Sequence, residues 1–169
     1  MKRSYQQDSI SLNQLINIMV DHGAENISVY LKKLGLSGEQ NCLVLTPDEH
    51  YYYGEEDLKS IHTLVNLKRM NLIQDPDRFL HNLFRILAPN ANFIGCFKDT
   101  KPKTQNGAQS DKTSGLLTWF LNFLEKKPEH SISRSEITEL LETHGFRIVD
   151  ITEIDGLIFF CSRNVRKQS

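Results

Sequence analysis

The segment TPDEHYYYG, residues 46–54, gathers side chains that can donate, accept or exchange a proton. It follows a short apolar run, residues 42–45, and places Asp48, Glu49 and His50 directly before three tyrosines. These groups suit general acid–base chemistry or an aromatic wall for a flat ligand. The alternative is a polar loop whose tyrosines cover one end of a small sheet. A metal site is not expected, because adjacent side chains on an extended segment point to alternate faces and do not converge.

A second polar group, NLKRMN, begins at Asn66, the end of the predicted strand 61–66. The amide of Asn66 could bond an amine or a hydroxyl group, and Lys68 or Arg69 could hold a carboxylate or a phosphate. The alternative is a solvated turn with basic residues.

The composition sets limits on the function. The chain has 169 residues, 39% of them hydrophobic and 24% charged, with a formal net charge of −1. This is the size of one domain, and the balance of charge favours neither nucleic acid nor an anionic membrane as a partner. No apolar stretch is long enough to span a bilayer, and the N-terminus lacks the apolar core of a secretory signal. The three cysteines lie far apart, which argues against a disulfide framework or a zinc site and favours a reducing cytoplasm.

Alternating helical and strand patterns predict the elements that must position these residues. Residues 1–40 carry two amphipathic helices, and residues 41–98 carry three strands and a helix that starts at Asp75-Pro76. Residues 99–115 are rich in small polar residues and predict a mobile surface loop. Residues 116–163 carry two further helices, the second starting at the capping box Ser133 to Glu136, and a hairpin of residues 147–153 and 157–162. Residues 164–169 form a tail.

These patterns predict an α/β domain, with a mostly parallel sheet inside and helices on both faces. The closing hairpin adds an antiparallel edge to that sheet.

Three stretches in the second half carry a resemblance to a known family. They are DPDRFLHNLFRILAPNANFIGCF, SRSEITELLETHGFRIVDITEI and GLIFFCSRN. Together they resemble the C-terminal half of class I S-adenosylmethionine-dependent methyltransferases. In that family an aspartate–proline pair opens the helix after the fourth strand, a leucine-X-proline turn leads to the fifth strand, and a late helix ending in Gly-Phe feeds the closing hairpin. The resemblance covers roughly half of the chain.

The resemblance implies a shortened Rossmann-like fold, in which residues 42–45 form the family's first strand and residues 61–66 its fourth. It places the site at the segments that follow these two strands. The cofactor-binding residues it implies are Thr46, Asp48, His50 and Asn66, and the substrate-binding residues are Tyr51, Lys68, Arg69 and Asn71. It assigns no catalytic residue.

The sequence departs from the family in its cofactor-binding half. A nucleotide-like cofactor lying against a strand-to-helix turn needs glycines there, and the chain has no GxG sequence anywhere. The corresponding turn holds Thr46-Pro47, whose proline contributes no amide. The residues between Leu45 and Ile61 are too few for two strand–helix units, so the family's second and third strands are predicted to be absent. The acidic residue that holds the ribose hydroxyls in the family follows its second strand, so it is predicted to be absent as well.

Three hypotheses about function remain. The chain is a methyltransferase-like protein with a degenerate S-adenosylmethionine site that methylates a small molecule or a glycan precursor. Alternatively, it is a non-catalytic, methyltransferase-like binding or regulatory subunit. The loss of two strands would leave the first strand at an open sheet edge, where a homodimer or another protein partner could join. The third hypothesis is a small α/β binder of another ligand.

Overall fold

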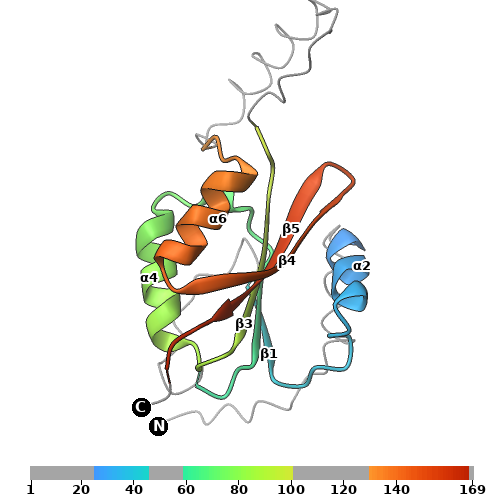
Figure 1. The fold of residues 1–169 in the computed structure, drawn as a ribbon. Helices are drawn as coiled ribbons and strands as arrows, with labels where there is room; N and C mark the ends of the chain where they lie inside the picture. The colour runs from blue at the N-terminus through green and yellow to red at the C-terminus, as the bar shows by residue number, and fades with distance from the viewer. Residues whose placement is uncertain (1–24, 46–58, 101–129, 168–169) are drawn as a thin grey trace, which may run out of the picture.

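The computed structural model describes residues 25–45, 59–100 and 130–167 (Figure 1). The first predicted helix, the polar segment 46–54, most of the loop 99–115 and the helix predicted from residue 116 lie outside these ranges.

The described residues form one sheet and its covering helices. The five strands are ordered β1-β2-β3-β5-β4, with β1, β2 and β3 parallel and β5 antiparallel to both of its neighbours. This confirms the predicted α/β class and the antiparallel closing hairpin. In chain order the elements are α2 (Glu25–Lys33), β1 (Cys42–Leu45), β2 (Thr63–Asn66), the 3-10 helix η1 (Met70–Leu72), α4 (Pro76–Ile86), β3 (Asn92–Phe97), α6 (Arg134–Thr143), β4 (Phe146–Ile154) and β5 (Leu157–Asn164).

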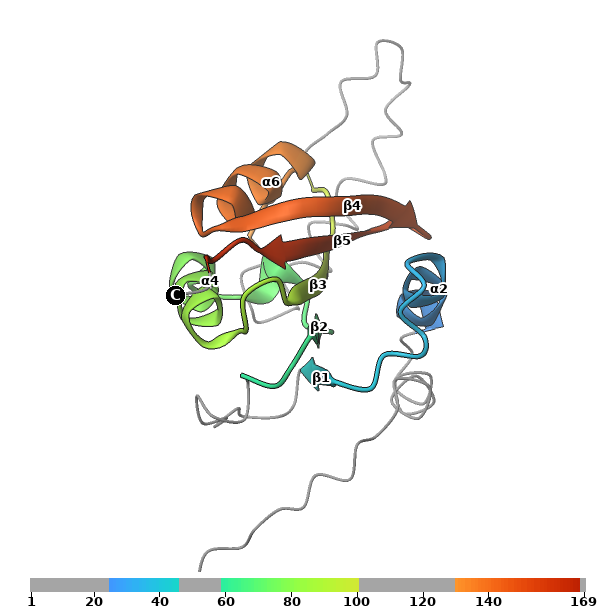
Figure 2. The ribbon, with the colours of Figure 1, turned by 60° about the horizontal axis from the view of Figure 1, so that its bottom comes forward.

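Helices cover both faces of the sheet. Helices α4 and α6 lie on one face and α2 lies on the other (Figure 2). Alternate strand residues divide between the two layers, as a pleated strand requires. In β2, for example, Leu64 belongs to the cluster beneath α4 and α6, whereas Val65 belongs to the cluster beneath α2.

Local signals start and end the elements. Asp75 accepts a hydrogen bond from the backbone N–H of Arg78 at 2.9 Å, with proline at the first turn of α4. Ser133 and Glu136 form the predicted capping box of α6. Positive φ angles of 50° at Asp155 and 80° at Gly156 make the tight turn between β4 and β5. These three predictions are confirmed.

Two predicted boundaries differ from the structure. Strand β2 begins at Thr63 rather than at Ile61, and residues in the polar group that follows it form η1. The hairpin strands extend beyond the predicted 147–153 and 157–162, because Phe146 pairs with Asn164. Pairing with a partner strand, which no local pattern records, sets these ends.

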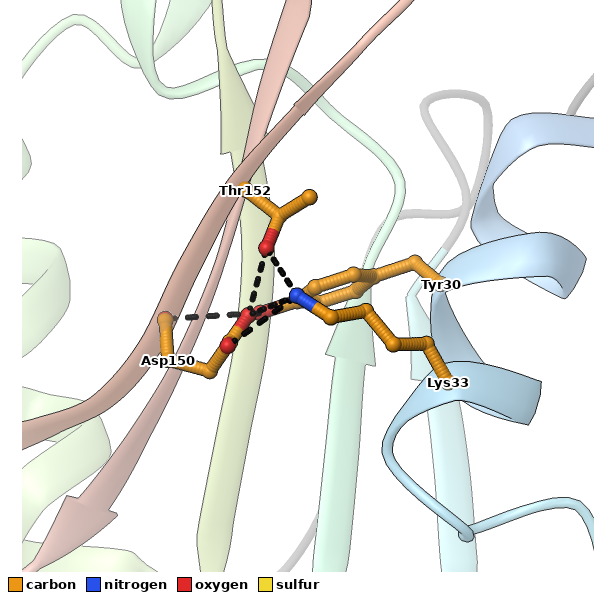
Figure 3. A network of polar contacts seen from close by, with 4 residues as sticks. All are labelled: Tyr30, Lys33, Asp150 and Thr152. Carbon is orange, nitrogen blue, oxygen red and sulfur yellow. Dashed lines mark hydrogen bonds and ion pairs between the residues drawn. The ribbon is translucent and has the colours of Figure 1, made fainter.

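A polar network joins α2 to the outer strand β4 (Figure 3). The Tyr30 hydroxyl donates to Asp150 Oδ2 at 2.9 Å, and Lys33 Nζ lies 3.2 Å from Asp150 Oδ1. The Thr152 hydroxyl also donates to Asp150, at 2.9 Å, and Lys33 contacts that hydroxyl. Burial acts to raise the pKa of Asp150, but hydrogen bonds from Thr152, Tyr30 and Lys33 together with the Lys33 charge outweigh it and lower the pKa below its usual value.

This network predicts a loss of stability in acid. A carboxyl group whose pKa is lower in the folded than in the unfolded state stabilises the fold above the unfolded pKa, roughly 3.9. That contribution is lost as the pH falls through the folded pKa of Asp150. We expect the free energy of unfolding to fall more between about pH 5 and pH 2 in the wild type than in Asp150→Asn, measured by urea denaturation. Parallel pH profiles for the two proteins would contradict this.

Candidate functional site

The carboxyl ends of β1 and β2 are the place where a doubly wound sheet would bind its ligand. Leu45 and Asn66 stand side by side at these ends. In such sheets the ligand lies in a crevice that opens where the strand order reverses, with the first strand between the second and the fourth. Here the described strands run from β1 through β2 to β3 in one direction, with no reversal. The described strands therefore do not form that crevice.

Asn66, a predicted cofactor-binding residue, is buried at the end of β2. Its Nδ2 donates to the Lys68 carbonyl at 2.9 Å, and its Oδ1 accepts from the Lys68 N–H at 3.2 Å. The side chain thus closes a local turn, and both ends of its amide bond the backbone.

Asn71, a predicted substrate-binding residue, is fully buried in η1. Its Nδ2 donates to the carbonyls of Lys98 and His130, each at 2.9 Å, and its Oδ1 accepts from the Lys98 N–H at 2.8 Å. The backbone N–H of His130 also donates to the Asn71 carbonyl at 2.8 Å. One side chain therefore holds together the ends of β2 and β3 and the segment that leads into α6.

The remaining predicted residues divide into two groups. Lys68 and Arg69 are partly exposed beside the carboxyl end of β2. Burial raises the pKa of Cys96 to about 11, and the charge of Arg69 acts in the opposite direction. Thr46, Asp48, His50 and Tyr51 lie outside the described residues, so their assignment stays a prediction.

The three cysteines lie on the α2 face and are buried as free thiols. Burial raises the pKa of Cys42, Cys96 and Cys161 to about 11 each, so the thiols are neutral near pH 7. Within the described ranges, no group of three or more His, Cys, Asp or Glu side chains is arranged to hold a metal ion. No helix in those ranges is long and apolar enough to cross a membrane.

The sequence matches no known family model, and no curated protein matches it. Among solved structures, it is similar to an S-adenosylmethionine-dependent methyltransferase from Mesorhizobium loti, with 12% identity and a TM-score of 0.49 over 70% of this chain and 72% of that one. It is also similar to an S-adenosylmethionine-dependent methyltransferase from Aquifex aeolicus, with 17% identity and a TM-score of 0.43 over 83% of this chain and 63% of that one.

A third similarity is to the complex between the Haloferax volcanii methyltransferase activator Trm112 and a methyltransferase, with 11% identity and a TM-score of 0.48 over 66% of this chain and 57% of that one. The chain spans less than two thirds of the length of the Aquifex and Haloferax chains. Since each TM-score is below 0.5, the fold assignment rests on the strand order itself. The family resemblance predicts that the adjacent parallel strands β1, β2 and β3 are strands one, four and five of a doubly wound sheet. The described sheet, with three adjacent parallel strands and helices on both faces, is Rossmann-like.

Proposed function

We propose that this chain is a methyltransferase-like domain with a degenerate cofactor site, which acts as a non-catalytic binding or regulatory subunit and joins a partner chain at the edge of β1. A second copy of the chain is the simplest such partner. We further propose that the chain acts in the reducing cytoplasm, because its three cysteines are buried as free thiols.

The observation that carries this proposal is the position of β1. It lies at the end of the order of described strands and leads to its parallel neighbour β2 through residues 46–62 alone. One parallel crossover takes a dozen residues or more, so this connection has no room for two further strands with their helices. Residues 46–62 are therefore too few to include the family's second strand, which would carry the acidic residue for a ribose.

The hydrogen bonds of two amides at the carboxyl edge support a degenerate cofactor site. A nucleoside at this edge needs polar groups that are free to bond it, but the amides of Asn66 and Asn71 are already bonded to backbone groups. The outer edge of β1 is better suited to pair with a strand of a partner chain. The Asn41 carbonyl accepts hydrogen bonds from the N–H groups of His62 and Thr63, and the Leu45 carbonyl accepts one from Leu67. Because alternate residues of a strand direct their peptide groups to opposite sides, those of Cys42 and Val44 face the other side of β1.

Val44→Pro tests this edge, because proline removes the outward N–H group and leaves the bonds from β1 to β2 in place. We expect the wild type to have a mass near twice the 19.5 kDa of one chain by light scattering, and Val44→Pro to be a monomer. Val44→Thr, which keeps the N–H group and a β-branched side chain, is the matched control and should remain a dimer. A wild-type monomer over a range of concentrations, or a dimeric Val44→Pro, would count against pairing at this edge.

A catalytic alternative is supported by the basic residues at the carboxyl end of β2. Lys68 and Arg69 remain partly exposed there, and either could hold an anionic group of a small-molecule or glycan-precursor substrate. Methyl transfer requires alignment of the nucleophile with an already activated donor and needs little acid–base chemistry. Binding of S-adenosylmethionine to the isolated chain would favour this alternative.

A further inference from the structure

A row of polar side chains crosses the sheet at the opposite end, where β2 and β3 begin. Thr63 pairs with Asn92, and Asn92 pairs with Arg163 on β5. Arg163 in turn pairs with Arg147 on β4. Side chains paired in this way share one face of the sheet. The face is the α2 face, since Ile94 and Cys161, two residues along from the row, belong to the cluster beneath α2.

Two buried polar atoms in this row, Asn92 Oδ1 and Arg163 Nε, have no hydrogen-bond partner among the residues that the structure describes. The other end of the Asn92 amide donates to the Thr63 hydroxyl at 3.3 Å. A buried donor or acceptor without a partner costs free energy comparable to its desolvation, so such atoms are rare in folded proteins. Here two of them lie on adjacent, directly paired residues.

The same row brings two positive charges together. Arg147 and Arg163 stand opposite each other on neighbouring strands, an arrangement that destabilises a sheet when both side chains carry the same charge. Arg147 is exposed and Arg163 is partly exposed. Asp150, the next acidic residue along β4 on this face, is engaged by Tyr30, Lys33 and Thr152. No ion pair joins either arginine to a carboxylate within the described residues.

We propose that Arg147, Arg163 and Asn92 form an oxyanion-binding site on the α2 face, which takes a carboxylate or a phosphate group. An anion there neutralises the two facing guanidinium groups and gives their N–H donors charged acceptors. If the Asn92 side-chain amide is rotated by a half-turn, the Thr63 hydroxyl donates to the Asn92 Oδ1. The hydrogen bond between the two residues is then kept with donor and acceptor exchanged, and the Asn92 NH2 group is free to donate to the anion. The site lies at the amino ends of the parallel strands, away from the carboxyl edge where the family resemblance places its cofactor.

Anion titrations of the full chain test the site. Thermal unfolding is followed in sodium phosphate and in sodium acetate, each against sodium chloride at equal ionic strength. We expect phosphate, acetate or both to raise the midpoint of the wild type above its value in chloride, and the more effective anion identifies the group that the site takes. Arg163→Gln and Arg147→Gln should each weaken the apparent affinity about tenfold or more, as expected for loss of a hydrogen bond to a charged group.

Arg78→Gln is the matched control. It removes one positive charge from an exposed position on α4, on the opposite face, and should leave the anion response unchanged. In chloride alone, Arg163→Gln should be at least as stable as the wild type, because it removes one of two facing charges. A wild type that responds equally to all three salts would overturn the proposal. So would an Arg78→Gln variant that loses as much of the response as Arg163→Gln.

Discussion

Replacing Gly145 by alanine should lower the free energy of unfolding by about 2–4 kcal/mol. Gly145 follows the last turn of α6 with a φ of 83°, in the left-handed region that disfavours residues with a Cβ atom. A Cβ there would lie 2.4 Å from Cε2 of Phe84, whose ring packs edge-on against Phe146 in the core. Gly145→Ala therefore destabilises the fold in two ways, because it strains the backbone and displaces the ring of Phe84.

Gly156→Ala separates these two effects. Gly156 has a φ of 80°, but a Cβ there would meet no atom within 4 Å. Gly156→Ala therefore introduces backbone strain without a steric clash, and it should lower the free energy of unfolding by about 1–2 kcal/mol. Urea denaturation of both variants measures the difference. Equal losses would show that α4 moves aside freely at Phe84, contrary to the packing described above.

Asn71→Ala should destabilise the protein by about 2–4 kcal/mol, because it leaves the carbonyls of Lys98 and His130 and the N–H of Lys98 without their partner. A surface residue that only binds substrate would cost within about 0.5 kcal/mol when replaced. The size of the loss, measured by urea denaturation, therefore distinguishes a structural Asn71 from the predicted substrate-binding one.

Asn71→Asp gives a sharper readout. An ionised carboxylate keeps the acceptor for Lys98 but cannot donate to the two carbonyls, whereas a protonated carboxyl group can donate to one of them. Burial beside these carbonyls raises the carboxyl pKa in the folded state, so the variant should regain stability relative to the wild type as the pH falls towards about 4. A loss of stability in Asn71→Asp that does not change with pH would contradict the role of the Asn71 side chain as a hydrogen-bond donor.

The elements with local signals could be predicted from the sequence. The start of α4 at Asp75, the capping box of α6 and the turn before Gly156 each depend on residues within a few positions of one another. The parallel-to-antiparallel plan of the sheet followed from the order of these elements.

The candidate site could be predicted only in part, because the partners of its side chains lie far away in the sequence. The resemblance, which makes residues 61–66 the family's fourth strand, indicated Asn71 as a substrate-binding residue, yet its hydrogen bonds go to Lys98 and to His130, 59 residues away. The row that ends in Arg147 and Arg163 is equally invisible to a local pattern, since it depends on the register between β3, β5 and β4.

Titration with S-adenosylhomocysteine and S-adenosylmethionine tests the degenerate cofactor site most directly. A ligand at a hundred times its dissociation constant adds about 2.7 kcal/mol of stability, which for a chain of this size raises the unfolding midpoint by roughly 5–10 °C. We predict no shift with either compound up to about 1 mM, because residues 46–62 are too few for the family's second and third strands and contain no GxG sequence. A saturable rise of several degrees would contradict this account and show that the chain holds the nucleoside by other means.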